Sequence, residues 1–313
     1  MVAACSGAGS STSPSPSQSA TGSATASAGA TATASDGASA SSASSAATGG
    51  CDLSTLKTLA AGTLTIATDN PAYPPYFQPP ASGNAPAPWV LGDPTNGQGF
   101  ESAFAYALAS KLGYANNVVA WTVEPFDNSL KPGAKPFDFY IAQVSYTAAR
   151  AQAVDLSNGY YFVSQAIVSL EADPIAGAKT IADLKKYKFG AQRSTTASDT
   201  IKNVIVPTTA ASLYNTNDDG IAALKAMQID GLVVDLPTAF YITTAQLDNS
   251  VIVGQFPSAG AASAEHFSLV LAKGSPLTGC VNSAIASMKA DGSLAQITTK
   301  WLSDKASAPV IAP

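Results

Sequence analysis

An arginine at position 150 follows a strand-like segment, and its rarity makes that position informative. The 313-residue chain contains one other arginine, Arg193. The apolar run 137–144 has the character of a β-strand, and Ser145 and Thr147 lie between this run and Arg150. A planar guanidinium can donate two parallel hydrogen bonds to one carboxylate. The pattern therefore predicts a site that binds a small acid.

A candidate cation site lies at Asp235. This aspartate follows the apolar segment Gly-Leu-Val-Val at 231–234, and open α/β sheets bind ligands beyond the carboxyl ends of their strands. The alternative for Asp235 is a helix N-cap ahead of Pro237. Asp230, at the start of the same strand, fits a solvated or capping role.

The segment 138–161 resembles the corresponding stretch of the extracellular solute-binding proteins of family 3, the amino-acid receptors of ABC importers. In that family a strand ending in Ser-x-Thr-x-x-Arg precedes a Val-Asp-Phe-Ser-like element and a Tyr-Tyr pair. The resemblance continues over residues 62–302. The matching residues in this chain are Ser145, Thr147, Arg150, Val154, Asp155, Ser157, Tyr160 and Tyr161.

The resemblance implies a site for an amino acid's carboxylate and ammonium. Part of the carboxylate site lies where a helix is expected to begin, and unpaired backbone N–H groups there favour negative charge. The chain departs from the family at Ser194, where glycine is usual. The implied ammonium ligand is Asp235. The implied carboxylate ligands are Arg150, Ser145, Thr147, Thr195 and Thr196.

The resemblance also implies walls for the ligand's side chain. The run 68–77 is similar to the family's Asp-x-x-Tyr-x-Pro-Phe turn, and it contains Asp69 and Tyr73. Tyr73 and Phe126 would sandwich the side chain, with core packing as the alternative for each ring. Asp69 would meet a polar or basic group, or hold the turn through backbone hydrogen bonds. Gln143 stands where some relatives have a small hydroxyl residue.

Short strand-like runs alternate with helical patterns from residue 64 onward, which predicts an α/β fold with largely parallel sheets. The resemblance specifies this further as a two-lobed, periplasmic-binding-protein-like (type II) fold with a hinge of two crossing segments. The first lobe is expected to hold residues 51–164 plus 268–313, and the second lobe residues 165–267. A loop at 78–99 is longer than the family's turn, and Trp89 within it would cover the cleft mouth or anchor the loop.

The first fifty residues differ in composition from the rest of the chain. Between positions 6 and 50, 41 of 45 residues are Ser, Ala, Thr or Gly, which predicts a disordered linker. Residues 1–5 end in Ala-Ala-Cys, which looks like the end of a bacterial lipoprotein signal with Cys5 as the lipidated residue. The alternative is an accidental match. The expected location is the extracellular face of the cell membrane, with a lipid anchor.

Two further cysteines, Cys51 and Cys280, stand near the two ends of the folded portion. An even pair in an exported protein predicts a disulfide, with two inert thiols as the alternative. A bridge closing so long a loop would stabilise by about 4–5 kcal/mol in the chain-entropy model.

Charge and composition argue against several classes of function. The formal net charge is −5 without a strongly basic cluster, so nucleic acid is not an expected partner. No metal or cofactor is expected, because no metal cluster or Ser/His/Asp set can be assembled around the single histidine, His266. Together with these exclusions, the resemblance implies a monomeric binding protein, not an enzyme, that works with an ABC permease. The alternatives are a cyclic-acid dehydratase-like enzyme on this scaffold, or a receptor with a separate signalling partner.

Overall fold

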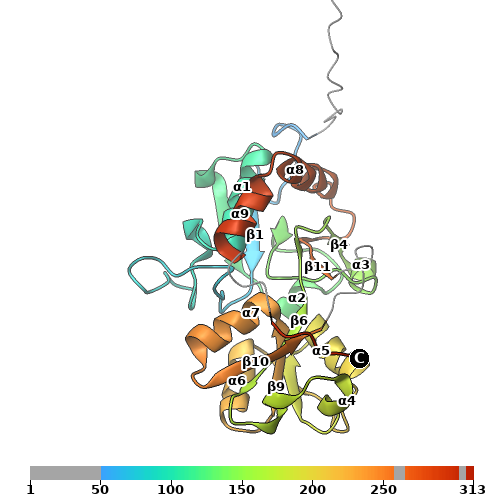
Figure 1. The fold of residues 1–313 in the computed structure, drawn as a ribbon. Coiled ribbons are helices and arrows are strands. Elements are labelled where there is room, and N and C mark those ends of the chain that lie inside the picture. The colour runs from blue at the N-terminus through green and yellow to red at the C-terminus, as the bar shows by residue number, and fades with distance from the viewer. Residues whose placement is uncertain (1–50, 257–264, 303–307) are drawn as a thin grey trace, which may run out of the picture. The chain divides into compact units, whose positions relative to one another are not determined.

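The structure is a computed structural model that describes residues 51–256, 265–302 and 308–313 (Figure 1). Within these residues the chain folds into two α/β lobes, each built around a five-stranded sheet. The predicted two-lobed α/β fold is therefore confirmed. The predicted lipobox with Cys5 and the predicted linker at 6–50 lie outside the described residues.

The sheet of the first lobe is parallel on one side and antiparallel on the other. β1 pairs in parallel with β2 and β3, and it buries Leu64 and Ile66 completely. β12 pairs antiparallel with β3 and β4, so a strand from late in the chain completes the sheet. The strands, in sheet order, are β2 (Val119–Val123), β1 (Leu64–Thr68), β3 (Phe139–Tyr140), β12 (Val270–Leu271) and β4 (Asp155–Leu156).

Helices cover this sheet and pack on one another. The apolar face of α1 is buried through Phe100, Phe104 and Leu108, which follow one another at helical spacing. Glu101, in the first turn of α1, is also fully buried. α1 contacts α8 and α9. The helices of the first lobe are α1 (Phe100–Lys111), α2 (Phe126–Ser129), α3 (Arg150–Ala153), α8 (Thr278–Ala290) and α9 (Ser293–Leu302).

The sheet of the second lobe also mixes strand directions. β7 pairs in parallel with β8 and β9, whereas β6 pairs antiparallel with β9 and β10. The expectation of largely parallel sheets was thus too simple for both lobes. The strands, in sheet order, are β10 (Ser250–Gln255), β6 (Gln165–Leu170), β9 (Gly231–Asp235), β7 (Phe189–Gln192) and β8 (Ser212–Tyr214).

The second lobe has a separate hydrophobic core on each face of its sheet. Val233 belongs to one core and Val234 to the other, as neighbouring strand residues point to opposite faces. The π-helical turns 201–205 and 242–246 extend α5 and α7. The helices are α4 (Ile181–Leu184), α5 (Thr196–Thr200), α6 (Asn217–Lys225) and α7 (Leu236–Tyr241).

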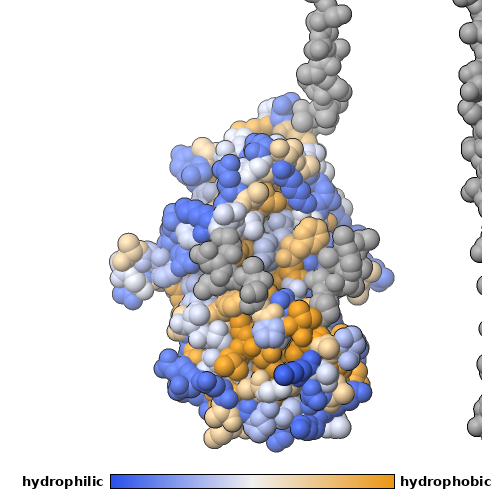
Figure 2. Space-filling model, in the orientation of Figure 1, coloured by the Kyte–Doolittle hydropathy of each residue, from blue (hydrophilic) through white to orange (hydrophobic). Residues whose placement is uncertain are grey.

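The chain passes between the lobes after β5 (Tyr161–Phe162) and returns before β11 (His266–Phe267), and these two strands pair antiparallel. Residues 308–312 differ from the expected lobe boundaries. They pair with the second lobe, where Ile311 donates its N–H to Gln255 (2.9 Å) and is only 1% exposed. The remaining boundaries stay a prediction. Hydrophobic surface gathers on the second lobe where β10 and this C-terminal tail lie (Figure 2).

The long loop at 78–99 is tied to the first lobe. Trp89 is buried in the first-lobe core, and Asn70 exchanges hydrogen bonds with Pro88 and Val90 (2.8 and 2.9 Å). Of the two expectations for Trp89, the structure therefore supports the anchor. Among the described residues, no helix combines the length and apolarity needed to cross a bilayer.

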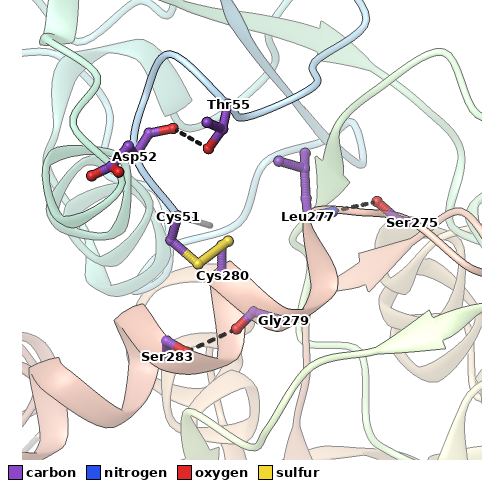
Figure 3. Close-up of a disulfide and its surroundings, with 8 residues drawn as sticks. All are labelled: Cys51, Asp52, Thr55, Ser275, Leu277, Gly279, Cys280 and Ser283. Carbon is purple, nitrogen blue, oxygen red and sulfur yellow. Dashed lines mark hydrogen bonds between the residues drawn. A yellow bond between two sulfur atoms is a disulfide. The ribbon is translucent and has the colours of Figure 1, made fainter. Parts of the chain in front are cut away.

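Cys51 and Cys280 form the expected disulfide, with a Cα–Cα distance of 5.4 Å (Figure 3). The bridge joins the start of the described chain to α8. Farther along the same N-terminal segment, the backbone N–H groups of Leu59 and Thr65 donate hydrogen bonds to the buried carboxylate of Asp138 (2.8 and 2.7 Å). Residues 51–65 are thus held by one covalent and two polar links.

Candidate functional site

Side chains from both lobes line one cavity with about 650 Å³ of empty space, including space open to solvent. Eight of the ten predicted ligand-binding residues lie on its wall, whereas Ser145 and Thr147 do not line it. The role of all ten residues as ligand contacts stays a prediction. The predicted residues that line the cavity are Asp69, Tyr73, Phe126, Gln143, Arg150, Thr195, Thr196 and Asp235.

The guanidinium of Arg150 is held by backbone carbonyls of both lobes. It donates to Ser145 O in the first lobe and to Ser194 O in the second lobe, the latter at 2.7 Å. Its central carbon lies 5.6 Å from the centroid of the Phe126 ring. Burial lowers the pKa of this guanidinium, while nearby acids oppose the shift. The two lobes therefore place one cation at the cavity, where it can bind an anion.

The hydroxyl residues near Arg150 have structural partners. Thr147 Oγ1 accepts a hydrogen bond from the backbone N–H of Arg150 (3.1 Å) and so supports the start of α3. Thr195 caps α5 by accepting from Ser198 N (3.3 Å). Thr196, the first residue of α5, donates across the cleft to Ser145 Oγ (3.3 Å). Of these hydroxyl residues, only Thr195 and Thr196 also line the cavity.

Asp235 stands at the end of β9, where α7 begins. It occupies the N-cap position, but its side chain makes no capping hydrogen bond. Instead Oδ1 accepts from Gln165 Nε2 at 2.6 Å. Burial raises the pKa of the Asp235 carboxyl well above its usual range, and the nearby Glu265 adds to the rise. A ligand ammonium would stabilise the charged form.

Two residues of this region were missed at the sequence level. Gln165 Nε2 donates to both Asp235 and Glu265, and Ser145 Oγ donates to Glu265 Oε1 at 2.6 Å. Glu265 stood out only as a neighbour of His266, and nothing singled out Gln165. Gln165 could have been found only from the register of β6 against β9, in which it pairs with Asp235. That register is known only once the strands are placed in the fold.

Asp69 fills one of its two predicted roles, that of holding the turn, and also lines the cavity; its contact with a ligand stays a prediction. Oδ1 accepts from the N–H of Asn70 (2.9 Å), which supports the turn, and Oδ2 accepts from Gln192 in the other lobe (3.4 Å). Burial raises the pKa of its carboxyl from 3.8 to about 6. Neither of these hydrogen-bond partners of the Asp69 carboxylate is a cation. A cationic group or an N–H donor of a ligand would therefore stabilise its charge.

Tyr73 and Phe126 are largely buried, and both line the cavity. Tyr73 Oη accepts from the N–H of Asp218 in the second lobe at 3.3 Å. Phe126 contributes to a first-lobe core cluster and carries Arg150 over its ring. Both rings are therefore fixed before any ligand enters, although the sandwich itself stays a prediction.

Gln143 is held in position by an acid that the sequence did not single out. Glu101 accepts hydrogen bonds from the backbone N–H (2.8 Å) and the side chain of Gln143, and from Tyr160 Oη. Gln143 has a φ of 50°, in the left-handed region. Burial raises the pKa of Glu101 from 4.5 to about 7. Glu101 had no signal of its own, because its neighbours Phe100 and Phe104 marked the helix face as apolar.

His266 does not line the cavity: its ring stacks on that of Tyr146 with centroids 5.4 Å apart. In the described part of the chain, no group of three or more His, Cys, Asp or Glu residues could hold a metal ion.

Two α/β lobes joined by crossing segments, with opposite charges at a shared cavity, have the architecture of a two-lobed solute-binding protein. The model of the bacterial extracellular solute-binding proteins, family 3, matches residues 81–304. The chain belongs to this family.

Two sequence relatives and one solved structure illustrate what the chain is similar to. The L-cystine-binding protein TcyJ of Escherichia coli (strain K12) is 27% identical over 248 residues, which are 78% of this chain and 84% of that protein. The L-arginine-binding protein of Pseudomonas aeruginosa is 27% identical over 268 residues, or 80% of this chain and 96% of that protein. An ancestral arginine-binding protein bound to arginine has a TM-score of 0.61 at 26% identity, covering 77% of this chain and 98% of the other.

Proposed function

We propose that this protein is the extracytoplasmic substrate-binding component of an ABC importer and captures a polar amino acid between its lobes. The observation that carries the proposal is that Arg150 and Asp235, from opposite lobes, line the same cavity. An amino acid presents the two complementary charges. The similar proteins named above, which bind cystine or arginine, support the choice of ligand class.

Hinge closure follows from this division of charge. An open form offers the carboxylate site on one lobe and the ammonium site on the other, so a ligand satisfies both charges only when the lobes meet. A ligand shifts a conformational equilibrium by its difference in affinity for the two states. The contacts between Arg150 and Ser194, and between Ser145 and Thr196, already join the lobes in the described arrangement.

Asp69 favours a ligand with a polar or basic side chain. Its carboxylate faces the cavity and has the Gln192 amide as its side-chain partner. An acidic side chain would meet two carboxylates, those of Asp69 and Asp235, and like charges at short range are destabilising. An amide, ammonium or guanidinium group would instead donate hydrogen bonds to Asp69.

The proposed setting is the extracellular face of the cell membrane. In this proposal Cys5 carries the lipid, residues 6–50 act as the linker, and the monomeric receptor delivers its ligand to an ABC permease. Labelling cells with a radioactive or clickable fatty acid tests the anchor, because Cys5→Ser should abolish the label. A label that persists in Cys5→Ser would reject Cys5 as the lipidated residue.

The first test of function is a thermal-shift screen of the full chain with the twenty common amino acids, followed by calorimetry. A millimolar ligand with a micromolar Kd should stabilise the protein by about 4 kcal/mol. Arg150→Ala should then bind at least about tenfold more weakly, because it loses a charge-assisted contact in a desolvated site. The matched control is Arg193→Ala, which removes the arginine outside the cavity. Normal binding by Arg150→Ala would refute the assigned anion site.

The second candidate is an exported enzyme on the same scaffold. One similar structure, 27% identical with a TM-score of 0.58, is an ancestral amino-acid-binding protein described as a precursor of cyclohexadienyl dehydratase; it covers 77% of this chain and 95% of its own length. Asp69, whose pKa is about 6, could serve as an acid in the cavity. NMR of each ligand after prolonged incubation separates the two functions, since a receptor returns its ligand unchanged.

A further inference from the structure

The long loop at 78–99 is bonded to the turn at 69–77, although no residue of the loop lines the cavity. The backbone N–H of Ala72 donates to Val90 O (3.0 Å), and Ala72 O accepts from the N–H of Gly92 (2.8 Å), so the two segments form a parallel β-bridge. The loop therefore supports the cavity wall without being part of it. The residues of the turn that line the cavity are Asp69, Pro71, Ala72, Tyr73 and Phe77.

At Gly92 the loop lies directly on the backbone of the turn. A Cβ atom at this position would collide with the carbonyl oxygens of Ala72 and Phe77, so no side chain fits between the two segments. Trp89, three residues earlier, is buried in the first-lobe core and anchors the loop there. Because close-packed groups transmit a displacement to their neighbours, a shift of the loop must move the turn.

Asn70 connects this loop to the acid at the cavity. Its Nδ2 donates to Pro88 O (2.8 Å) and its Oδ1 accepts from the N–H of Val90 (2.9 Å), so the loop binds both ends of the amide. The backbone N–H of Asn70 donates to Asp69 Oδ1 at 2.9 Å, whereas the Gln192 amide of the other lobe lies 3.4 Å from Oδ2. The peptide group of Asn70 thus orients the Asp69 carboxylate, and the loop orients that peptide group.

We propose that Asn70 is a positioning residue for ligand selectivity, through which the loop at 78–99 holds the Asp69 carboxylate against the side chain of a bound amino acid. This inference rests on the proposed function, because it requires an amino-acid ligand whose side chain reaches Asp69. Hydrogen bonds weaken steeply as their angle departs from the optimum, so a carboxylate that can turn away loses its preference for a polar or basic group. The residues proposed for the ligand's own charges, Arg150 and Asp235, lie on other elements.

The test compares ligands with and without a polar side-chain end. Wild-type protein and Asn70→Ala, as full chains, are titrated calorimetrically with L-arginine, L-glutamine and L-norvaline, whose propyl side chain carries no polar group. Asn70→Ala removes both amide bonds to the loop and keeps the backbone N–H that binds Asp69. It should weaken binding of arginine or glutamine, whichever the wild type prefers, about tenfold or more, and change norvaline binding less than about threefold.

Asn96→Ala is the matched control within the same loop. The Asn96 side chain also bridges two backbone groups, donating to Gln78 O (3.0 Å) and accepting from Gln98 N (2.7 Å), and neither partner lines the cavity. This variant should lower the thermal midpoint to a similar extent as Asn70→Ala and leave the preference over norvaline unchanged. An equal loss for all three ligands in Asn70→Ala, or no loss, would overturn the inference, because selectivity would not depend on Asn70.

Failure of the proposed function has a different signature, since wild-type protein would then bind no amino acid in the thermal-shift screen. A wild type that binds amino acids but prefers neither arginine nor glutamine to norvaline would leave the function standing and overturn the role of Asn70. If Asn70→Ala does not fold, Asn70→Ser, whose shorter side chain cannot span both loop groups, should show the same selective loss. An unchanged preference in that variant would also overturn the inference.

Discussion

At the scale of single residues, Glu101 is a buried acid that links α1 to the wall of the cavity. Its carboxyl is fully buried at the start of α1 and holds the cavity residue Gln143 through two hydrogen bonds. In the folded state its pKa is about 7, whereas its ordinary value is 4.5. The folded protein therefore keeps a proton in a pH range where the unfolded chain has released it.

This difference predicts how stability varies with pH. Between pH 4.5 and about 7, the folded state binds more protons than the unfolded state, so raising the pH favours unfolding. The contribution of Glu101 is complete below pH 4.5 and is lost as pH rises through about 7. At about 1.4 kcal/mol for each pH unit, the loss is roughly 3 kcal/mol. Asp69, whose pKa rises from 3.8 to about 6, acts in the same direction.

Urea denaturation from pH 4 to pH 8 measures this effect. Glu101→Gln cannot ionise and should show a flatter loss of stability than wild type over this range, with the remaining slope coming from Asp69 and Asp235, while Glu171→Gln, at an exposed position, should follow wild type. A wild-type slope in Glu101→Gln would mean that Glu101 is ionised in the folded protein.

The sequence predicted those site residues that carry local signals. Arg150 and Asp235 each follow an apolar strand, and Asp69 and Tyr73 lie in one short turn motif. Gln165, Glu265 and Glu101 lack such signals, because their contacts join residues 70, 100 and 42 positions apart. Only the packed fold brings those groups together.

At the scale of elements, the turn between β7 and α5 carries backbone strain. Ser194 has a φ of 61°, and its carbonyl accepts the hydrogen bond from Arg150. A residue other than glycine in this left-handed region costs about 1–2 kcal/mol. The exposed side chain of Ser194 makes no hydrogen bond described in the structure that offsets this cost.

Ser194→Gly should therefore stabilise the protein by roughly 0.5–1 kcal/mol. This net value is the relieved strain minus the cost of the greater entropy that glycine gives the unfolded chain. The carbonyl that binds Arg150 is unchanged, so ligand affinity should be retained. Ser110→Gly, at an exposed position in α1, is the opposite control and should destabilise by about 0.5–1 kcal/mol. Thermal denaturation of both variants gives the comparison, and a loss of stability in Ser194→Gly would contradict the assigned strain.

The elements were predicted better than their pairing. β3 lies within the apolar run 137–144, and β9 begins with the apolar segment 231–234. The directions of β6 and β12 could not be predicted, because alternation along a strand specifies which face is buried and not which neighbour it meets.

At the scale of the whole molecule, the C-terminal tail adds a second-lobe contact to a chain whose preceding helix, α9, belongs to the first lobe. Ile311 is buried in the second-lobe core, next to Gly254. The tail also bonds to the backbone of Lys179 and Ile181 through Ala312, at 2.9 Å each. The second lobe is thus completed by residues that follow a first-lobe helix in the chain.

Ile311→Ala should destabilise the protein by about 2–4 kcal/mol, since it removes a fully buried side chain. The neighbouring Val310 is 59% exposed, so Val310→Ala should change stability by less than about 0.5 kcal/mol. Equilibrium denaturation of the two variants provides the measurement. Equal effects would mean that the tail does not contribute to the second-lobe core in solution.

The disulfide of Figure 3 also determines how a mechanical load would enter the fold. A pull on the backbone ahead of Cys51 passes through the two sulfur atoms into α8, which packs on α1 and α9. Residues 52–63, which lead into β1, lie outside that covalent path. A load applied from the N-terminal side therefore bypasses β1, the strand whose last residue, Thr68, lines the cavity.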